Sequence, residues 1–357
     1  MNKYKTAIEI LKILKQKNFK SYIVGGYPRD KYLGIENDDI DICTSAKYKD
    51  LKKLFNDIEN NKYNSYKLKY KEYEFEITTF RKEIGYINSR FPKKIKYTRS
   101  LKKDLKRRDF IINTLCIDEN EQYIDLMNAK QDIDKQIIRL IGSKKKIEED
   151  SLRILRAIRF ATILNFKIDK KIDIAIEKYK SNLENLSFDR KKQELEKIFE
   201  SKNAKYGIRL IKEYGLEKYL RINVDDIVVT DNINGIWAQV LTDDSYNFNK
   251  KEKKEIEKIV NLKNKRFDIY NLYKYGIDIM NIVKEIKREK RNIEKLYEEL
   301  PIKDRDEIKI NFFDMCKTID ANNSNIETIY EDLEKQIVHQ KLKNTKRELL
   351  KYIKGKY

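Results

Sequence analysis

Segments with the character of β-strands occur only in the first 142 residues, and this uneven distribution constrains the fold more than any other feature. Each segment is β-branched or aromatic-rich and short enough for a strand: "SYIVGG", "DIDICTSA", "EFEITTF", "FIINTLCID" and "QYIDLM". An amphipathic helix is predicted before them, with Ala7, Ile8, Leu11 and Leu14 on one face. From Glu148 onward the apolar residues recur at helical spacing. The pattern predicts an α+β chain in which a head with a small mixed sheet precedes an all-helical C-terminal body.

Domain boundaries have to be inferred from these changes of periodicity. The 10 glycines and 3 prolines are too sparse to mark linkers. We predict a head over residues 1–141, a helical neck over 142–200 and a helical body and tail over 201–357. A long basic segment at residues 81–106 carries few strand signals and is predicted to be a mobile loop.

Charge and cysteine content limit the class of protein. The net charge of +20 and pI of about 9.4 indicate an anionic partner. Because Lys, Asn, Ile and Tyr are all abundant, an AT-rich genome with many solvated lysines is an equally good interpretation of the charge alone. The 3 cysteines show no CxxC spacing, which argues against a disulfide framework or a zinc site. No stretch reaches membrane-spanning length and the first residues lack a signal-peptide core, so we expect a cytoplasmic protein.

Two carboxylates form a candidate metal site in the segment "DDIDI". Side chains at positions i and i+2 of a strand share one face, so Asp39 and Asp41 would lie side by side, with Ile40 and Ile42 packed on the other face. Such a pair is poorly tolerated unless it is protonated or binds a cation, and oxygen ligands select hard ions such as Mg²⁺. Glu76, on another predicted strand, is a candidate third ligand. A strand edge with solvated acids is the alternative, and for a lone D-x-D motif it is the better one.

The turn before these acids points to a phosphate ligand. In "VGGYPRD" a strand is followed by Gly25 and Gly26, and then by Pro28 at a position that suits the first turn of a helix. Glycines allow backbone amides to approach an anion closely, and Arg29 adds a charged donor. A phosphate-binding turn directly before a metal-binding strand is typical of a nucleoside triphosphate site.

An ordered series of motifs resembles the class II template-independent RNA nucleotidyltransferases, the family of tRNA CCA-adding enzymes and bacterial poly(A) polymerases. The motifs cover roughly residues 20–200 and comprise "GGYPRDKYLGIENDDIDICT", "RRDFIINTL", "EEDSLRILRAIRFA" and "LSFDRKKQELEKIF". The segment "TTFRKEIGYINSRFPKKIKY" resembles the flexible loop of that family. The resemblance implies a polymerase-β-like head.

The resemblance also assigns roles to individual residues. Asp39 and Asp41 would bind two Mg²⁺ ions, with Glu76 a less certain ligand, and Gly25, Gly26 and Arg29 would hold the triphosphate. Residues that would contact the sugar are Arg108, Asp109 and Asn113, where a carboxylate suits a ribose 2′-hydroxyl. Residues of the nucleotide-templating motif are Glu149, Asp150, Arg153 and Arg156.

The templating motif can be interpreted through hydrogen-bond patterns. On a helix, Asp150 and Arg153 are neighbours at i and i+3, so an acceptor and a fork of donors point the same way. Cytosine and adenine both present an amino donor beside a ring acceptor, whereas uracil and guanine present the reverse pattern. The pair would therefore accept C and A. Glu149 would orient Arg153, and Arg156 lies on the same stripe; in an isolated helix, surface ion pairs would be the simpler interpretation.

The predicted function is addition of CCA to the tRNA 3′ end from CTP and ATP, with the acceptor stem held by the basic helical body. Within the family, a CC-adding enzyme and an A-adding or poly(A) polymerase are alternatives. An RNA-binding protein with an inactive head is a third alternative, which the intact Asp39 and Asp41 disfavour. The tRNA 3′-hydroxyl would be the attacking group, activated by the metal ions, so no side-chain nucleophile is needed. No nucleic acid template would be read.

Overall fold

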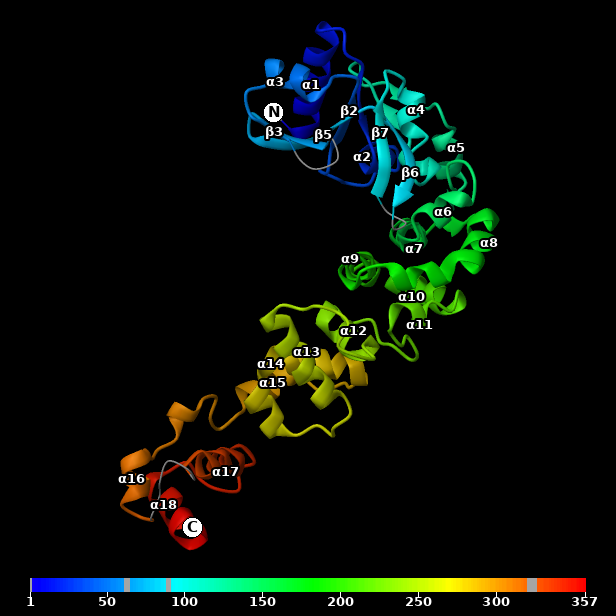
Figure 1. Ribbon diagram of the computed structural model, residues 1–357. Coiled ribbons are helices and arrows are strands. Elements are labelled where there is room, and N and C mark those ends of the chain that lie inside the picture. Colours follow the sequence, from blue (N-terminus) through cyan, green and yellow to red (C-terminus); the bar gives the residue numbers. More distant parts are fainter. Residues whose placement is uncertain (1, 61–64, 88–90, 320–325) are drawn as a thin grey trace. The chain divides into compact units, whose positions relative to one another are not determined.

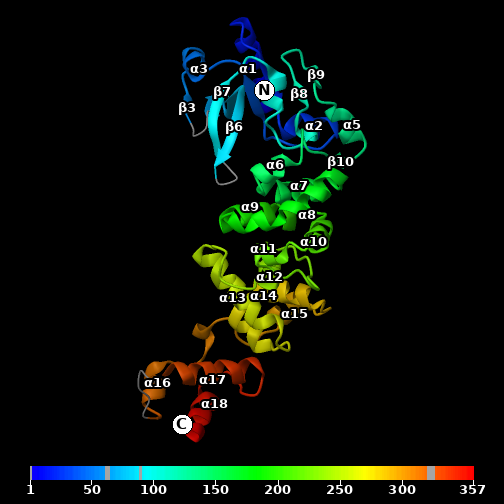
Figure 2. The same cartoon turned by 45° about the vertical axis from the view of Figure 1, so that its right-hand side comes forward.

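The computed structural model describes residues 2–60, 65–87, 91–319 and 326–357 and divides the chain into two compact units, Met1–Arg221 and Ile222–Tyr357. Figures 1 and 2 show the helices and strands of both units. The first unit contains the mixed sheet and a set of helices after it. Among the described residues that follow Ile168, strands give way to helices, with one isolated bridge between Ile222 and Leu241. The predicted α+β class is therefore confirmed, and the division into head, neck and body stays a prediction.

The first unit begins with α1 and the strands of the sheet. Its elements up to the end of the sheet are α1 Lys3–Gln16, β1 Ser21–Val24, α2 Gly26–Tyr32, β2 Asp41–Thr44, α3 Tyr48–Leu54, β3 Ile58–Asn60, β4 Ser65–Tyr70, β5 Tyr73–Thr79, β6 Arg81–Ile87, β7 Phe91–Tyr97, α4 Leu101–Leu105, the 3₁₀ turn η2 Ile111–Asn113, β8 Cys116–Ile117 and β9 Tyr123–Ile124. The elements after it are α5 Ala129–Asp134, β10 Ile137–Ile138, α6 Lys145–Glu149, α7 Leu152–Leu164, β11 Lys167–Ile168, α8 Lys170–Tyr179, η3 Lys180–Asn185, α9 Phe188–Phe199, α10 Ala204–Glu213 and α11 Glu217–Leu220.

The main sheet is mixed, as predicted. Its strand order is β3-β4-β5-β2-β1-β8-β9, in which β2 pairs with β5 in parallel and the other neighbours are antiparallel. Strands form in all five predicted segments, but β3 and β4 were not predicted. The segment "FIINTLCID" is a strand only at its end. There the Thr114 hydroxyl and amide both donate to the Ile111 carbonyl, which closes a turn in place of an extended strand.

The two faces of the sheet explain how the acids reach the site. Helix α1 covers one face, where Ile40 and Ile42 are buried with residues of α1 such as Leu11 and Leu14. Side chains alternate along a strand, so Asp41 projects to the opposite face together with Cys43. That face is covered by α4 and the turn that follows it. The apolar side of this short strand therefore fixes the direction of its carboxylate.

The prediction of a strand-poor loop at residues 81–106 is wrong. Strands β6 and β7 form a separate antiparallel pair (Figure 2) in register from Arg81 opposite Tyr97 to Ile87 opposite Phe91, and α4 follows. Lysines, Gly85 and Pro92 hide the alternation in the sequence, because their strand propensity is low. Main-chain pairing between the two strands nevertheless forms. Residues 88–90 lie outside the described part, so the predicted mobility is untested there.

Apart from the isolated bridge between Ile222 and Leu241, the regular elements in the described residues of the second unit are helices. Its elements are α12 Ile233–Val240, α13 Lys250–Lys263, α14 Ile269–Lys287, α15 Ile293–Glu298, the 3₁₀ turn η4 Arg305–Glu307, α16 Phe312–Cys316, α17 Ile326–Val338 and α18 Lys346–Lys356. The buried Trp237 of α12 packs against Tyr246 and Phe248. Helix α14 has a kink at Gly276, where φ is 82°, a value that favours glycine.

A candidate nucleotide-transfer site

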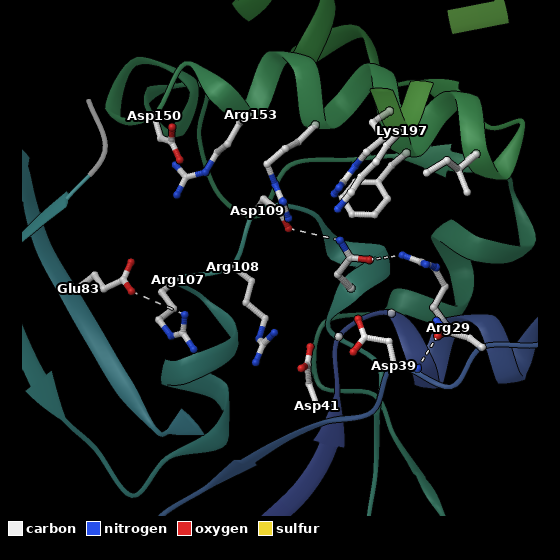
Figure 3. A pocket seen from close by; sticks show the side chains of 18 residues that line it. Arg29, Asp39, Asp41, Glu83, Arg107, Arg108, Asp109, Asp150, Arg153 and Lys197 are labelled. Carbon is white, nitrogen blue, oxygen red and sulfur yellow. Dashed lines mark hydrogen bonds and ion pairs between the residues drawn. The ribbon is translucent and has the colours of Figure 1, made fainter. Parts of the chain in front are cut away.

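A pocket of about 590 Å³ in the first unit gathers most of the predicted site residues (Figure 3). Of the thirteen residues predicted from the sequence, only Glu76 and Glu149 do not line it. The lining side chains come mainly from α2, from the connection before β2, from the segment between α4 and the end of η2 and from α7, with single residues from β6, from the α6–α7 connection and from α9. Those predicted from sequence are Gly25, Gly26, Arg29, Asp39, Asp41, Arg108, Asp109, Asn113, Asp150, Arg153 and Arg156.

The carboxylates of Asp39 and Asp41 both lie at one end of this pocket (Figure 3). Asp41 is the first residue of β2, whereas Asp39 precedes the strand, so the prediction that both belong to the strand is wrong for Asp39. Gly25 lies directly beside them at φ 90°, and a Cβ built there would be 3.0 Å from Oδ2 of Asp41. A side chain at position 25 would therefore be strained and would crowd the carboxylate.

Electrostatics mark Asp41 as a site for a cation. Burial raises its pKa to about 7, and the charges of Asp39 and Glu76 add to this effect against Arg108 and Lys3. Glu76 is the register partner of Asp41 in the parallel pair β2–β5. A buried carboxylate next to two others is costly unless a proton or a metal ion is bound.

This shift predicts how pH affects the stability of the metal-free protein. The pKa of Asp41 is higher in the folded chain than the ordinary value of 3.8, so folding favours its protonated form. The contribution of Asp41 to the free energy of unfolding is favourable near pH 4 and is lost as pH rises through about 7. In a chelating buffer we expect Asp41→Asn to melt several degrees above the wild type at pH 8 and at a similar temperature near pH 4. If the difference between the two melting temperatures stays constant from pH 4 to pH 8, Asp41 is not the group whose pKa is raised.

Asp109 is the centre of a second set of contacts. It is buried, and its Oδ2 accepts a hydrogen bond from Nε of Arg156 at 2.7 Å and forms an ion pair with Nη2 of the same guanidinium at 2.6 Å. Its Oδ1 accepts from the Phe110 amide at 2.8 Å and from Nδ2 of Asn113 at 3.4 Å. Burial raises the pKa of Asp109, but the charge and hydrogen bonds of Arg156 outweigh it and hold the pKa well below its usual range. Asp109 is therefore an ionised anchor for the arginine.

Arg29 links the glycine turn to the same set. The buried guanidinium donates through Nη1 to Oδ1 of Asn113 at 2.5 Å and through Nε to Asp30 at 2.7 Å. Its charged carbon lies 5.3 Å from the centre of the Phe160 ring. Figure 3 shows Arg29 on the side of the pocket where Asp39 lies. Contacts on several sides hold this cation close to the glycine turn.

The predicted single helix through "EEDSLRILRAIRFA" is wrong. Helix α6 ends at Glu149, and α7 begins at Leu152. Asp150 between them is extended, with φ −149° and ψ 97°, and its Oδ1 accepts from the Leu152 amide at 3.2 Å. A side chain that accepts from the first amides of a helix stabilises a helix start, and the sequence pattern alone did not reveal this break.

Asp150 and Arg153 nevertheless meet in the pocket, as Figure 3 shows. The expected pair of Glu149 with Arg153 is long, at 3.9 Å between Oε2 and Nη1. A shorter bond joins Nη1 of Arg153 to the Lys146 carbonyl at 2.5 Å. The backbone of α6 therefore contributes more to the position of Arg153 than Glu149 does.

Three family models match consecutive parts of the chain. They are described as the poly A polymerase head domain over residues 21–139, the probable RNA and SrmB-binding site of polymerase A over 165–222, and a putative tRNA nucleotidyltransferase domain 2 over 243–353. The chain is also 30% identical to a CCA-adding enzyme of Ligilactobacillus salivarius, over 99% of this chain and 96% of that one. The chain belongs to the class II family of CCA-adding enzymes and poly(A) polymerases.

Another relative and two solved structures are similar to nearly the whole chain. A CCA-adding enzyme of Streptococcus uberis is 31% identical over 87% of this chain and 86% of its own. A crystal structure of the Bacillus stearothermophilus CCA-adding enzyme in complex with CTP has a TM-score of 0.83 at 23% identity, covering 99% of this chain and 97% of the other. The Thermotoga maritima enzyme complexed with tRNA_CCA has a TM-score of 0.71 at 22% identity, with 97% and 94% covered. These structures share the fold.

Membership in this nucleotidyltransferase family implies dependence on a divalent metal. Asp39 and Asp41 fit such an ion, because both offer hard oxygen donors at a place where their mutual repulsion calls for a cation. Glu76 lines a neighbouring pocket of about 360 Å³ together with Asp41 and Arg108, and it accepts a hydrogen bond from the Ser65 hydroxyl. Within the described residues, no three His, Cys, Asp or Glu side chains are grouped to hold a metal, so ligation by Glu76 stays a prediction.

Several pocket residues of this family member were missed in the sequence. Arg159 and Phe160 belong to the motif already recognised. Glu83 of the β6–β7 hairpin and Arg107 of the turn after α4 form an ion pair, with 3.6 Å between Oε1 and Nη1. A signal existed for Arg159, because Arg153, Arg156 and Arg159 recur every three residues. Its Nε lies 3.2 Å from Glu194 of α9, a contact between distant segments that spacing alone does not reveal.

None of the helices in the described part of the chain has the length and apolar character needed to cross a bilayer.

Proposed function

We propose that this chain adds CCA to the 3′ end of tRNA, taking the nucleotides from CTP and ATP. The observation that carries the proposal is the single pocket in which the Asp39–Asp41 pair, the glycine turn with Arg29 and the Asp150–Arg153 pair all meet. The relatives named CCA-adding enzymes, and the structural neighbours solved with CTP and with tRNA, support the choice of substrates.

Asp39 and Asp41 would hold two Mg²⁺ ions, which when bound activate the attacking 3′-hydroxyl and stabilise the departing pyrophosphate. The Gly25–Gly26 turn leaves room for a phosphate close to the backbone, and Arg29 is held beside that turn by Asn113 and Asp30. Arg108 lines the pocket with Asp41, and its Nη2 lies 3.6 Å from Oδ2 of the buried Asp104. We assign this guanidinium to the triphosphate or the sugar.

The sugar and the base would be read by the other end of the pocket. Asp109 is ionised and held by Arg156, so it suits the ribose 2′-hydroxyl as an acceptor. Asp150 supplies an acceptor and Arg153 supplies donors. Cytosine and adenine complement this pair, whereas uracil and guanine would leave buried groups facing like groups, at a cost of about 1–3 kcal/mol for each unpaired group.

The rest of the chain would bind the RNA. The proposal retains a head over residues 1–141, a neck over 142–200 and a basic body and tail over 201–357 that contacts the phosphates of the acceptor stem. Such binding weakens steeply with salt. A cytoplasmic location, where tRNA is processed, belongs to the same proposal.

The experiment uses Mg²⁺ and a tRNA transcript that ends at the discriminator base, with CTP alone, ATP alone or both. We expect growth by CC with CTP and completion to CCA only with both nucleotides. Addition of CC without A would indicate a CC-adding enzyme, and long A tracts would indicate a poly(A) polymerase. Salt-sensitive tRNA binding without any extension would indicate an RNA-binding protein with an inactive head.

A further inference from the structure

Lys146 of α6 connects two parts of the pocket although it does not line the pocket itself. Its Nζ donates to the carbonyl of Lys106 at 2.6 Å and to the carbonyl of Arg108 at 2.5 Å. Both carbonyls belong to the turn after α4, which leads directly into Asp109. In the part of the chain that the structure describes, no other hydrogen bond ends on either carbonyl. Lys146 therefore stabilises the turn that presents Arg108 and Asp109.

The backbone of the same residue holds the base-reading arginine. The Lys146 carbonyl accepts from Nη1 of Arg153 at 2.5 Å, whereas the ion pair of Arg153 with Glu149 is 3.9 Å long. Arg153 is buried, so a lost contact is not readily replaced by water. One residue thus joins the sugar-reading turn through its side chain and the base-reading arginine through its carbonyl.

The side chain of Lys146 is held by specific contacts and is not a freely solvated lysine. Burial, followed by the charge of Arg153, lowers its pKa to about 8 against the charges of Asp109, Glu149 and Glu83. The ammonium still carries its proton at neutral pH and has three donors, two of which the carbonyls use. Its neighbour Lys145 is exposed and has no ion pair among the described residues. Only the second of these two adjacent lysines is fixed in place.

We propose that Lys146 is a positioning residue that sets the orientation of Arg153 relative to the turn at residues 106–109, and that it thereby controls discrimination of C and A from U and G. The inference rests on the proposed function and deepens it. Base discrimination depends on the direction of the guanidinium donors, because hydrogen bonds weaken steeply when misaligned. Without the Nζ contacts, α6 and its carbonyl can shift relative to the turn. The fork of Arg153 then no longer faces the base edge in one fixed direction.

The test compares kcat/KM for CTP and for UTP on a tRNA transcript lacking CCA, in the wild type, Lys146→Met and Lys145→Met. We expect Lys146→Met to lower the CTP-to-UTP ratio about tenfold, chiefly by raising UTP incorporation relative to CTP. Lys145→Met should retain the wild-type ratio. A merely structural role would lower turnover of both nucleotides in proportion to the folded fraction and leave their ratio unchanged. An unchanged ratio in Lys146→Met overturns the proposal.

A double-mutant cycle tests whether the effect passes through Arg153. In an Arg153→Ala background, Lys146→Met should change the ratio little further, and a full additional tenfold loss would contradict the proposal. If Lys146→Met does not fold, Lys146→Gln is measured in its place, because it keeps one donor group and should also show a lower ratio. A wild type that extends no tRNA overturns the proposed function and with it this inference. An active wild type with an unchanged ratio in both variants overturns the inference alone.

Discussion

Asp41→Asn is expected to reduce nucleotide transfer about a thousandfold or more while leaving the protein folded. The change replaces one charged oxygen ligand of the proposed metal pair by an amide of nearly the same shape. Burial and the repulsion by neighbouring carboxylates raise the pKa of Asp41, and both costs disappear with the charge, so the metal-free variant should be at least as stable as the wild type. Single-turnover extension of a tRNA transcript at saturating CTP, together with a melting curve, measures both effects.

Asp38→Asn is the matched control for this prediction. Asp38 is an exposed carboxylate that does not line the pocket, although it lies only three residues from Asp41. Its loss should leave turnover within about twofold of the wild type, since surface substitutions have small effects. A variant Asp41→Asn that keeps a tenth or more of the wild-type rate would show that this carboxylate does not hold the catalytic ion.

Asp109→Ala is expected to cost about 3 kcal/mol of folding stability as well as activity. Its carboxylate accepts a hydrogen bond from Arg156, forms an ion pair with the same guanidinium and accepts from the Phe110 amide, and removing it leaves a partly buried arginine without that partner. The other carboxylate near Arg156, that of Glu194, is 3.9 Å away, and the Phe160 ring is 5.4 Å from the guanidinium carbon, so these contacts replace little of this interaction. Urea unfolding with an unchanged m-value would measure the loss.

The double variant Asp109→Ala/Arg156→Met separates the ion pair from simple loss of packing. Because the penalty comes largely from an uncompensated charge, removing that charge should recover at least half of the lost stability. Activity should not return, since the acceptor for the ribose hydroxyl is still missing. Additive losses in the double variant would contradict the description of Asp109 as the anchor of Arg156.

The sequence predicted local features of the head well wherever apolar alternation was strong. Strand β5 alternates between buried and more exposed residues, whereas β1 and β2 are short, mostly buried segments that were recognised by their β-branched and aromatic residues. The direction of Asp41 follows from the burial of Ile40 and Ile42. The hairpin β6–β7 was missed because its strands contain lysines, Gly85 and Pro92, so cross-strand pairing forms without an apolar pattern.

Individual side-chain hydrogen bonds could not be predicted from the sequence, whether they are local or join distant segments. The break between α6 and α7 at Asp150 depends on a local side-chain hydrogen bond to the Leu152 amide, while the helical spacing of the sequence continues through the break. The two carbonyl contacts of Lys146 join residues about forty positions apart, and nothing in a run of three lysines distinguishes this one. The residue types of the site could thus be recognised by motif, whereas the contacts that orient them required the structure.

The claim that this chain adds the complete CCA is tested most directly by measuring the last step, the addition of the terminal A. A tRNA transcript that already ends in CC is incubated with the protein, Mg²⁺ and all four nucleoside triphosphates, and the products are read at single-nucleotide resolution. We expect that one A is added and that extension then stops. An unextended CC end would contradict complete CCA addition, and so would a ladder of several added nucleotides.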